Sequence, residues 1–159
     1  MNTLVVYFSL DGNTRFISEQ IANAANADIV ALTTKKRYPT SGFKKYFFGG
    51  KSVLFGEKPE LTNGHIDWDL YDTIIIGTPV WAGSYAPPMK TFLSKYHIAG
   101  KRVAVFACHG GGGAEKCLER IKKTIPDNEF IGEIDFVEPK KTSETSAAEA
   151  AKWASGLAH

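Results

Sequence analysis

The sequence contains few cysteines and no long apolar run. Its two cysteines, Cys108 and Cys117, do not form a CxxC pair, so we expect free thiols in a reducing, cytoplasmic setting. Together with His109 they lack the fourth ligand and the spacing of a zinc site. No apolar run approaches the ~20 residues of a membrane span. The N-terminus lacks the basic, apolar and small-residue order of a secretory signal. Neither a metal centre nor a membrane segment is therefore expected.

A strong charge of one sign is also absent. The 159 residues carry a net charge of +2, which is too small to indicate nucleic-acid binding. Apolar residues make up 43% of the chain and charged residues 23%, which is the balance of an ordinary globular protein. The length suits one domain, and no repeat or low-complexity linker divides the chain. Residues 1–159 are therefore predicted to form a single domain.

Strand-like and helix-like segments alternate along the whole chain. Helical spacing of apolar residues predicts helices that begin near Asn13, at Pro87 and near Ser143, with another around residues 117–125. Apolar runs predict strands at residues 3–8, 28–33, 71–77, 102–107 and 130–137. This alternation is typical of an α/β protein. We predict a doubly wound, five-stranded parallel sheet with the strand order 2-1-3-4-5.

Three loops of unusual composition follow the first, third and fourth predicted strands. They are SLDGNT at residues 9–14, TPVWAGSYAPP at residues 78–88 and CHGGGG at residues 108–113. In the predicted order the winding reverses between strands one and three, and ligands bind at the carboxyl ends of the strands near such a point. We therefore expect the three loops to converge on one ligand site.

The first loop has the composition of a phosphate-binding site. A loop that leads into a helix directs free backbone N–H groups at one point, and the helix dipole favours an anion there. Ser9, Asn13 and Thr14 add short polar side chains, and Gly12 permits close approach of the main chain. Asp11 would repel a phosphate, so its carboxylate is expected to point away or to cap the helix. An ordinary N-cap formed by Asp11 or Asn13 is the alternative.

The other two loops indicate a pocket for a planar ring. Trp81 beside Gly83 offers a flat apolar wall, and the alternative is a Trp81 packed under the following helix. Four consecutive glycines, residues 110–113, permit the main chain to lie against a planar ligand and donate N–H groups to it. A plain strand-to-helix turn is the alternative there. Together the loops predict a pocket for a phosphate and a flat heterocycle.

These residues resemble the flavodoxin family over nearly the whole chain. FSLDGNT, residues 8–14, is similar to the family's phosphate loop. IIIGTPVWAG, residues 74–83, followed by PPMKTFL, is similar to the flavin loop of a flavodoxin-like subgroup in which a Pro-Val-Trp triplet is typical. The resemblance implies a flavodoxin-like fold and non-covalent FMN. It implies that the FMN phosphate is bound by Ser9, Leu10, Asp11, Gly12, Asn13 and Thr14. It implies that the isoalloxazine ring is bordered by Thr78, Pro79, Val80, Trp81, Ala82 and Gly83. The pyrimidine side of the ring is then reached by Cys108, His109, Gly110 and Gly111.

The resemblance further implies a redox protein that carries electrons between partner proteins. A small NAD(P)H-dependent flavin reductase, acting on a quinone or similar acceptor, is the alternative. We favour the carrier because no G-x-G-x-x-G fingerprint follows the first strand. No catalytic residue is assigned, although His109 is considered as a proton donor. A flavin-free binding module or a phospho-receiver domain would share the strand order, but a receiver needs an aspartate where Gly77 and Thr78 end the third strand.

Two departures from the family pattern are present, and the one in the third loop bears on the redox potential. Asp11 stands where the family prefers threonine, and the third loop lacks the acidic residue and the stacking tyrosine of well-known electron carriers. Less negative charge beside a reduced flavin predicts a less negative potential, with one ring face open to a substrate.

Residues 35–60 differ in charge from the rest of the chain. They hold seven basic residues, two acidic residues (Glu57 and Glu60) and six aromatic residues. The segment indicates either a solvated excursion with an aromatic underside or a docking patch for an acidic redox partner. A short helix is expected near residues 43–54.

Overall fold

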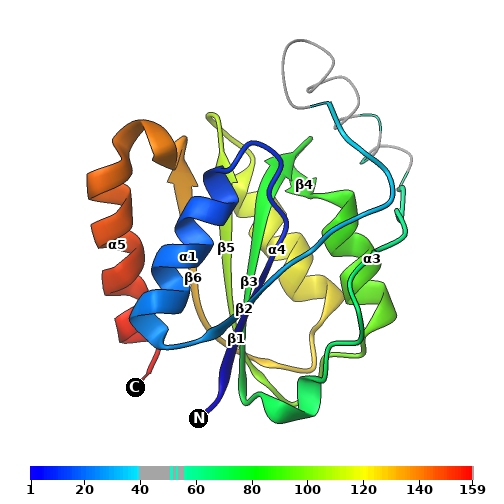
Figure 1. Ribbon diagram of the computed structural model, residues 1–159, viewed down its shortest axis with the longest axis horizontal. Coiled ribbons are helices and arrows are strands. Elements are labelled where there is room, and N and C mark those ends of the chain that lie inside the picture. The colour runs from blue at the N-terminus through cyan, green and yellow to red at the C-terminus, as the bar shows by residue number, and fades with distance from the viewer. Residues whose placement is uncertain (40–50, 52, 54–55, 159) are drawn as a thin grey trace.

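The computed structural model of the protein describes residues 1–39, 51, 53 and 56–158 (Figure 1). The helix expected near residues 43–54 and most of the basic, aromatic segment lie outside the described residues. No helix in the described ranges is long and apolar enough to cross a membrane.

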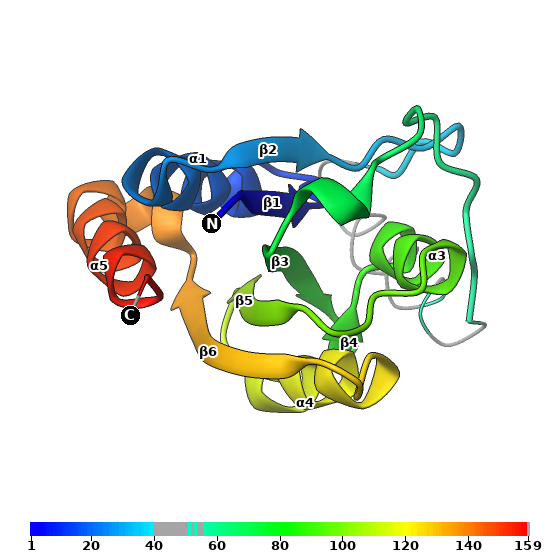
Figure 2. The same cartoon turned by 90° about the horizontal axis from the view of Figure 1, so that it is seen from below.

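Five parallel strands form the centre of the fold. They are β1 (Thr3–Tyr7), β2 (Asp28–Ala31), β3 (Thr73–Trp81), β5 (Arg102–His109) and β6 (Glu129–Val137), and they lie in the order β2-β1-β3-β5-β6. With the two-residue strand β4 set aside, this is the predicted order 2-1-3-4-5. The central strands β1, β3 and β5 are almost wholly buried, because helices cover both faces of the sheet (Figure 2).

In the described part of the chain, two helices cover each face of the sheet. On one face lie α1 (Asn13–Ala25) and α5 (Ser143–Gly156), and on the other lie α3 (Pro87–Lys95) and α4 (Ala114–Thr124) (Figure 2). Each helix buries an apolar stripe with helical spacing, including Ile17 and Ile21 of α1 and Cys117 and Ile121 of α4. Two short 3₁₀ helices, η1 (Trp68–Leu70) and η2 (Pro139–Thr142), complete the described elements.

The third strand is longer than the sequence predicted. Residues 78–81, expected as a loop, continue β3 through Trp81. Ala82 and Gly83 then turn the chain with φ values of 48° and 70°, and β4 (Ser84–Tyr85) returns antiparallel to β3. Two successive residues with positive φ form the tight turn that suits the twist of a hairpin. The expected loop at residues 78–88 is thus a hairpin that rises above the sheet. β5 likewise extends to His109, so the third loop begins later than predicted.

Gly77 in β3 is required by the packing of the next strand. A Cβ atom at this position would lie 2.2 Å from Cζ of Phe106, and Phe106 is fully buried in β5. The two residues are direct partners in the parallel register. The Phe106 ring therefore occupies the volume that any other residue at position 77 needs for its side chain.

We expect Gly77→Ala to destabilise the fold, because the added methyl group must displace a buried ring. Overpacking of this kind costs about 1–3 kcal/mol, which is measured as a lower urea midpoint in equilibrium unfolding. Gly64→Ala is the matched control, since a Cβ atom at Gly64 meets nothing within 4 Å. Equal midpoints for both variants would contradict the packing role of Gly77.

Candidate functional site

The parallel register brings the ends of β1, β3 and β5 to one edge of the sheet. Tyr7 pairs with Gly77 and Pro79 pairs with Cys108. The N–H of Phe8 donates to the carbonyl of Gly77 at 3.2 Å, so the first loop leaves the sheet beside β3. All three loops lie at the upper edge of the molecule in Figure 1. The structure therefore brings the three segments together, as the strand order predicted.

The polar side chains of the first loop bind the loop itself. The Ser9 hydroxyl accepts a hydrogen bond from the N–H of Gly12 at 3.2 Å, and the Asp11 carboxylate accepts one from the N–H of Asn13 at 3.1 Å. Gly12 adopts a φ of 95°, which favours glycine. The Asp11 carboxylate therefore bonds within the loop, while the N-cap of α1 is Gly12 and has no side-chain cap, so the expected N-cap by Asp11 or Asn13 is wrong. Leu10 is half-buried and packs at the rim of the core.

The amides that follow are those of the first turn of α1. The first turn of α1 gives the N–H groups of Thr14 and Arg15 no acceptor among the described residues. The N-cap residue Gly12 supplies no side-chain cap. Unsatisfied N–H groups at a helix start carry partial positive charge and favour an anion. The Thr14 side chain itself is buried beneath this turn.

Lys140 adds a positive charge that the sequence did not indicate. Its ammonium Nζ donates to the carbonyl of Asp11 at 3.2 Å, and it would lie 3.2 Å from a Cβ atom placed on Gly12. The backbone N–H of Lys140 donates to Oδ1 of Asn13 at 3.1 Å. Asn13 therefore anchors η2 beside the first loop. No pattern in the sequence links two segments that are 127 residues apart.

The second segment is held in place by Thr78. Its buried hydroxyl donates to the carbonyl of Pro79 at 2.8 Å and accepts from the N–H of Ala86 at 3.0 Å. Thr78 therefore ties the base of the hairpin to the start of α3, and its hydroxyl is engaged within the protein. Beyond it, Val80, Trp81 and Gly83 are half-buried and Ala82 is exposed.

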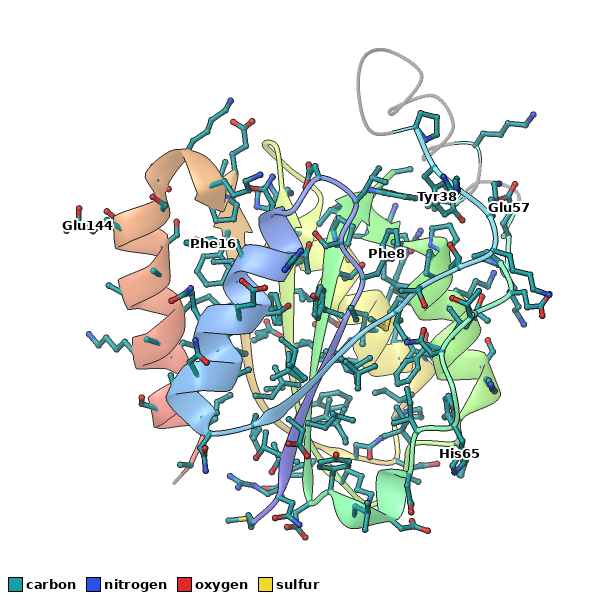
Figure 3. The ribbon with its side chains drawn as sticks, in the orientation of Figure 1. Phe8, Phe16, Tyr38, Glu57, His65 and Glu144 are labelled. Atoms are coloured by element: carbon teal, nitrogen blue, oxygen red, sulfur yellow. The ribbon has the colours of Figure 1, made fainter. Side chains whose placement is uncertain are left out.

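Trp81 packs against aromatic residues from two other segments. Its ring lies edge-on to Phe8, with centroids 5.8 Å apart, and to Tyr38, with centroids 5.2 Å apart. Phe8 and Tyr38 also contact each other, as Figure 3 shows. These partners come from the end of β1 and from the segment after β2, and Trp81 also packs against the core cluster that contains the buried residues of α3. The sequence placed Tyr38 among the six aromatic residues of residues 35–60 and gave no link to Trp81.

The Tyr38 hydroxyl is buried without a partner. Tyr38 is only 9% exposed, and no hydrogen-bonding group of the described chain reaches its Oη. Burial, with a smaller contribution from Glu57, raises the pKa of Tyr38 to about 12, so the hydroxyl keeps its proton at neutral pH. An unsatisfied buried hydroxyl costs about 1–3 kcal/mol. A ligand that offered an acceptor beside Trp81 would remove this cost.

Cys108 reaches the site only through its backbone. Its side chain is buried on the face of the sheet covered by α1 and α5. Burial raises the pKa of the thiol to about 12, although a hydrogen bond with the Thr14 side chain opposes the shift. Burial raises the pKa of Cys117 to about 12 as well. Both thiols are free, and no cluster of potential metal ligands occurs among the described residues.

His109 organises the glycine loop. Its Nδ1 accepts hydrogen bonds from the N–H groups of Gly111 at 3.1 Å and Gly112 at 2.9 Å. A nitrogen that accepts two N–H groups carries no proton, so the proton resides on Nε2 and is donated to Asp135 at 2.7 Å. Both ring nitrogens are therefore engaged, and the imidazole is only 8% exposed. The geometry favours a positioning role for His109 over the considered role as a proton donor.

The glycine loop and the hairpin touch. Gly113 has a φ of 82°, and a Cβ atom on it would lie 3.2 Å from Cα of Gly83 and 3.2 Å from Cγ1 of Val80. Gly110 and Gly111 are exposed, so their main chain is accessible to a ligand. The second and third segments thus form one continuous wall at the edge of the sheet.

Comparison with known proteins agrees with this arrangement. The sequence model of the flavodoxin family matches residues 2–153. The chain belongs to the flavodoxin family. The match spans both the segments that carry the candidate site and the helices that support them.

Solved flavoproteins share the fold of this family member at low sequence identity. One from Lactobacillus acidophilus NCFM, crystallised in complex with FMN, is 23% identical, with a TM-score of 0.72 over 90% of this chain and 97% of that chain. A flavoprotein from Bacteroides eggerthii is 22% identical, with a TM-score of 0.74 over 96% and 98% of the two chains. A flavone reductase is 10% identical, with a TM-score of 0.64 over 99% of this chain and 62% of that chain.

We expect His109→Phe to loosen the glycine loop, because phenylalanine offers no acceptor to Gly111 and Gly112. Two neutral hydrogen bonds of about 0.5–1.5 kcal/mol each correspond to amide exchange roughly tenfold or more faster at these glycines. Hydrogen exchange followed by NMR measures this. In the control Asp135→Asn the amide oxygen still accepts from Nε2, so protection at the glycines is retained. Unchanged exchange in His109→Phe would show that the loop is held by other contacts.

Proposed function

We propose that this protein binds FMN at the carboxyl edge of its sheet and passes electrons between partner proteins. Family membership supports FMN as the cofactor, and a similar flavoprotein was crystallised with it. The observation that carries the proposal is the convergence of an unfilled helix start, a positive side chain and an aromatic wall at one edge. FMN supplies the one- and two-electron redox chemistry, and the protein supplies placement and electrostatics.

The residues present fit a phosphate at one end of the site. We propose that the N–H groups of Thr14 and Arg15 and the ammonium of Lys140 hold the 5′-phosphate. The hydrogen bonds that Ser9 and Asp11 accept from amides of the same loop hold the loop in a shape that suits the phosphate. The bond to the N–H of Asn13 also directs the Asp11 carboxylate toward that amide. A charge-assisted hydrogen bond from Lys140 would offset the repulsion from Asp11.

The residues also fit a planar ring at the other end. We propose that the ring lies against the wall of Val80, Trp81 and Gly83, with the main chain of Gly110 and Gly111 at its pyrimidine side. Tyr38 supports this placement of the ring. Its protonated hydroxyl is buried beside Trp81 and has no hydrogen-bond partner among the described residues. A ring carbonyl or nitrogen is a suitable acceptor for it.

We favour the carrier over the reductase, and we propose an acidic partner for the basic segment. In the described part of that segment, Glu60 pairs with Lys35 at 2.8 Å and Glu57 pairs with Lys36, so its two acids neutralise two of its seven basic residues. Positive charge is left to attract an acidic surface. Both cysteines are free, which supports our proposal of a reducing compartment such as the cytoplasm.

A reductase is the second candidate, because one structural neighbour is a flavone reductase. A phospho-receiver role is disfavoured by the position of Asp72. This residue accepts a hydrogen bond from the N–H of Asn2 at the start of the sheet, which is the end opposite to the candidate site.

FMN binding is tested by colour and by selectivity for the phosphate. We expect the purified protein with FMN to show bands near ~375 and ~450 nm. We expect Lys140→Met to weaken FMN binding about tenfold and to leave riboflavin binding unchanged, because a charge-assisted contact of about 1.5–3 kcal/mol is lost only when a phosphate is present. Fluorescence quenching titrations of both flavins measure this.

Lys141→Met is the matched control for that variant. Lys141 neighbours Lys140 but pairs with Glu138 at 2.8 Å, so its loss is expected to leave both affinities unchanged. A Lys140→Met variant that weakened FMN and riboflavin equally would contradict a phosphate contact. A protein that bound neither flavin would refute the proposed function.

The kinetics of flavin reduction distinguish an electron carrier from an NAD(P)H-dependent reductase. A carrier is fed by another protein, so we expect NADH and NADPH to reduce the FMN-loaded protein no faster than they reduce free FMN. Stopped-flow absorbance measures this. Rapid direct reduction by either nucleotide would contradict the carrier function and favour the reductase.

A further inference from the structure

A second cavity lies outside the candidate flavin site. It is bordered by β4, α3 and α4 and by Val53, Gly56 and Glu57. Its volume of about 370 Å³ is within the range of about 300–1,000 Å³ that small-molecule pockets occupy. Its wall on α4 includes Arg120 and Lys123. These residues lie about 9 and 14 Å along the helix from Ala114, at ~1.5 Å per residue. The cavity is therefore below the edge where the three loops meet.

The lining of this cavity is strongly positive. Lys90 of α3 and Arg120 and Lys123 of α4 all border it. Among the described residues no acidic side chain forms an ion pair with Arg120 or Lys123. On α4, Glu119 forms an ion pair with Lys122, and the pKa of Glu119 is lowered mainly by Lys122 and less by the charge of Lys123. Among the described residues, the ammonium of Lys90 donates to the carbonyl of Gly56 at 3.3 Å.

Among the described lining residues Glu57 is the one acid, and it does not cancel this charge. Glu57 forms an ion pair with Lys36 at 2.5 Å, so its charge is already opposed from outside the cavity. A recess bordered by charges of one sign focuses the field and concentrates ions of the opposite sign. The cavity is therefore suited to an anion that carries more than one charge.

The other lining groups suit a phosphate that carries an organic part. The Thr124 hydroxyl donates to the carbonyl of Arg120 at 2.8 Å, so the Tyr85 hydroxyl, 3.1 Å away, donates to Thr124. Pro87 and the ring of Tyr85 give apolar surface. A guanidinium binds phosphate through two parallel hydrogen bonds, which a single ammonium cannot do. We propose that this cavity binds a small organic phosphate of the size of a nucleoside phosphate.

The cavity shares a structural element with the flavin wall, although the proposal does not depend on FMN. Ser84 and Tyr85 line the cavity, and they pair in register with Trp81 and Val80. A ligand bound to β4 would therefore contact the strand whose partner borders the flavin. An organic phosphate at this place is well located to be an electron donor, an acceptor or an effector of the redox site.

The experiment is a calorimetric titration with ADP, with adenosine and inorganic phosphate as partial ligands. We expect ADP to bind more tightly than phosphate and adenosine not to bind. The double variant Arg120→Gln/Lys123→Gln is expected to weaken ADP binding tenfold or more. The control Lys95→Gln/Lys152→Gln removes two exposed positive charges elsewhere and is expected to leave it unchanged. Chemical shift changes at Tyr85 and Thr124 should accompany binding.

Three outcomes would overturn the proposal. ADP binding that both double variants weaken equally would reflect net charge alone. ADP binding that Lys140→Met or saturating FMN abolishes would place the nucleotide at the start of α1. Binding of an acidic peptide through Arg120 and Lys123, with no binding of ADP, would make the recess part of a protein interface. Because the titration is run with and without FMN, its result is separate from the test of flavin binding.

Discussion

The parallel pairing of β1, β3 and β5 is the constraint on which the rest of this structure depends. Backbone hydrogen bonds fix Tyr7 beside Gly77 and Pro79 beside Cys108, so the three strands end at one edge. Apolar side chains on both faces prevent a slip in register, since a shift of one residue would turn every buried side chain to the opposite face. Gly77 shows how tight this arrangement is, because the ring of Phe106 fills the place of its missing side chain.

The side chains of the loops at that edge form hydrogen bonds within the protein, so that backbone groups are left to contact a ligand. Ser9 and Asp11 bind amides of the first loop, Thr78 ties the hairpin to α3, and His109 holds two glycine amides. These hydrogen bonds hold the loops in place before a ligand binds, which reduces the conformational entropy that the loops lose on binding. It also explains why residues with hydroxyl, amide and carboxylate groups surround the phosphate site proposed here.

Positive charge in this protein gathers at three places with different partners. Lys140 lies against the first loop, Arg120 and Lys123 border the cavity beside β4, and the segment at residues 35–60 is basic overall. A net charge of only +2 hides these local concentrations. Electrostatic recognition depends on the local field and not on the total, so the phosphate, the organic anion and the acidic partner proposed here are compatible with a nearly neutral chain.

The sequence by itself determined the sheet order, the helices and the convergence of three loops, because hydrophobic periodicity and strand order are written in local patterns. Even there, the sequence predicts a loop where the structure has a hairpin at residues 81–84. A two-residue turn between such short strand segments gives only a weak sequence signal. Only the tertiary structure decided which side chains face the site. It brought Lys140 to Asp11 and Tyr38 to Trp81, and it fixed the protonated nitrogen of His109 through Asp135. These contacts join residues that lie far apart in the chain, and packing of whole elements, not neighbouring sequence, sets their distance.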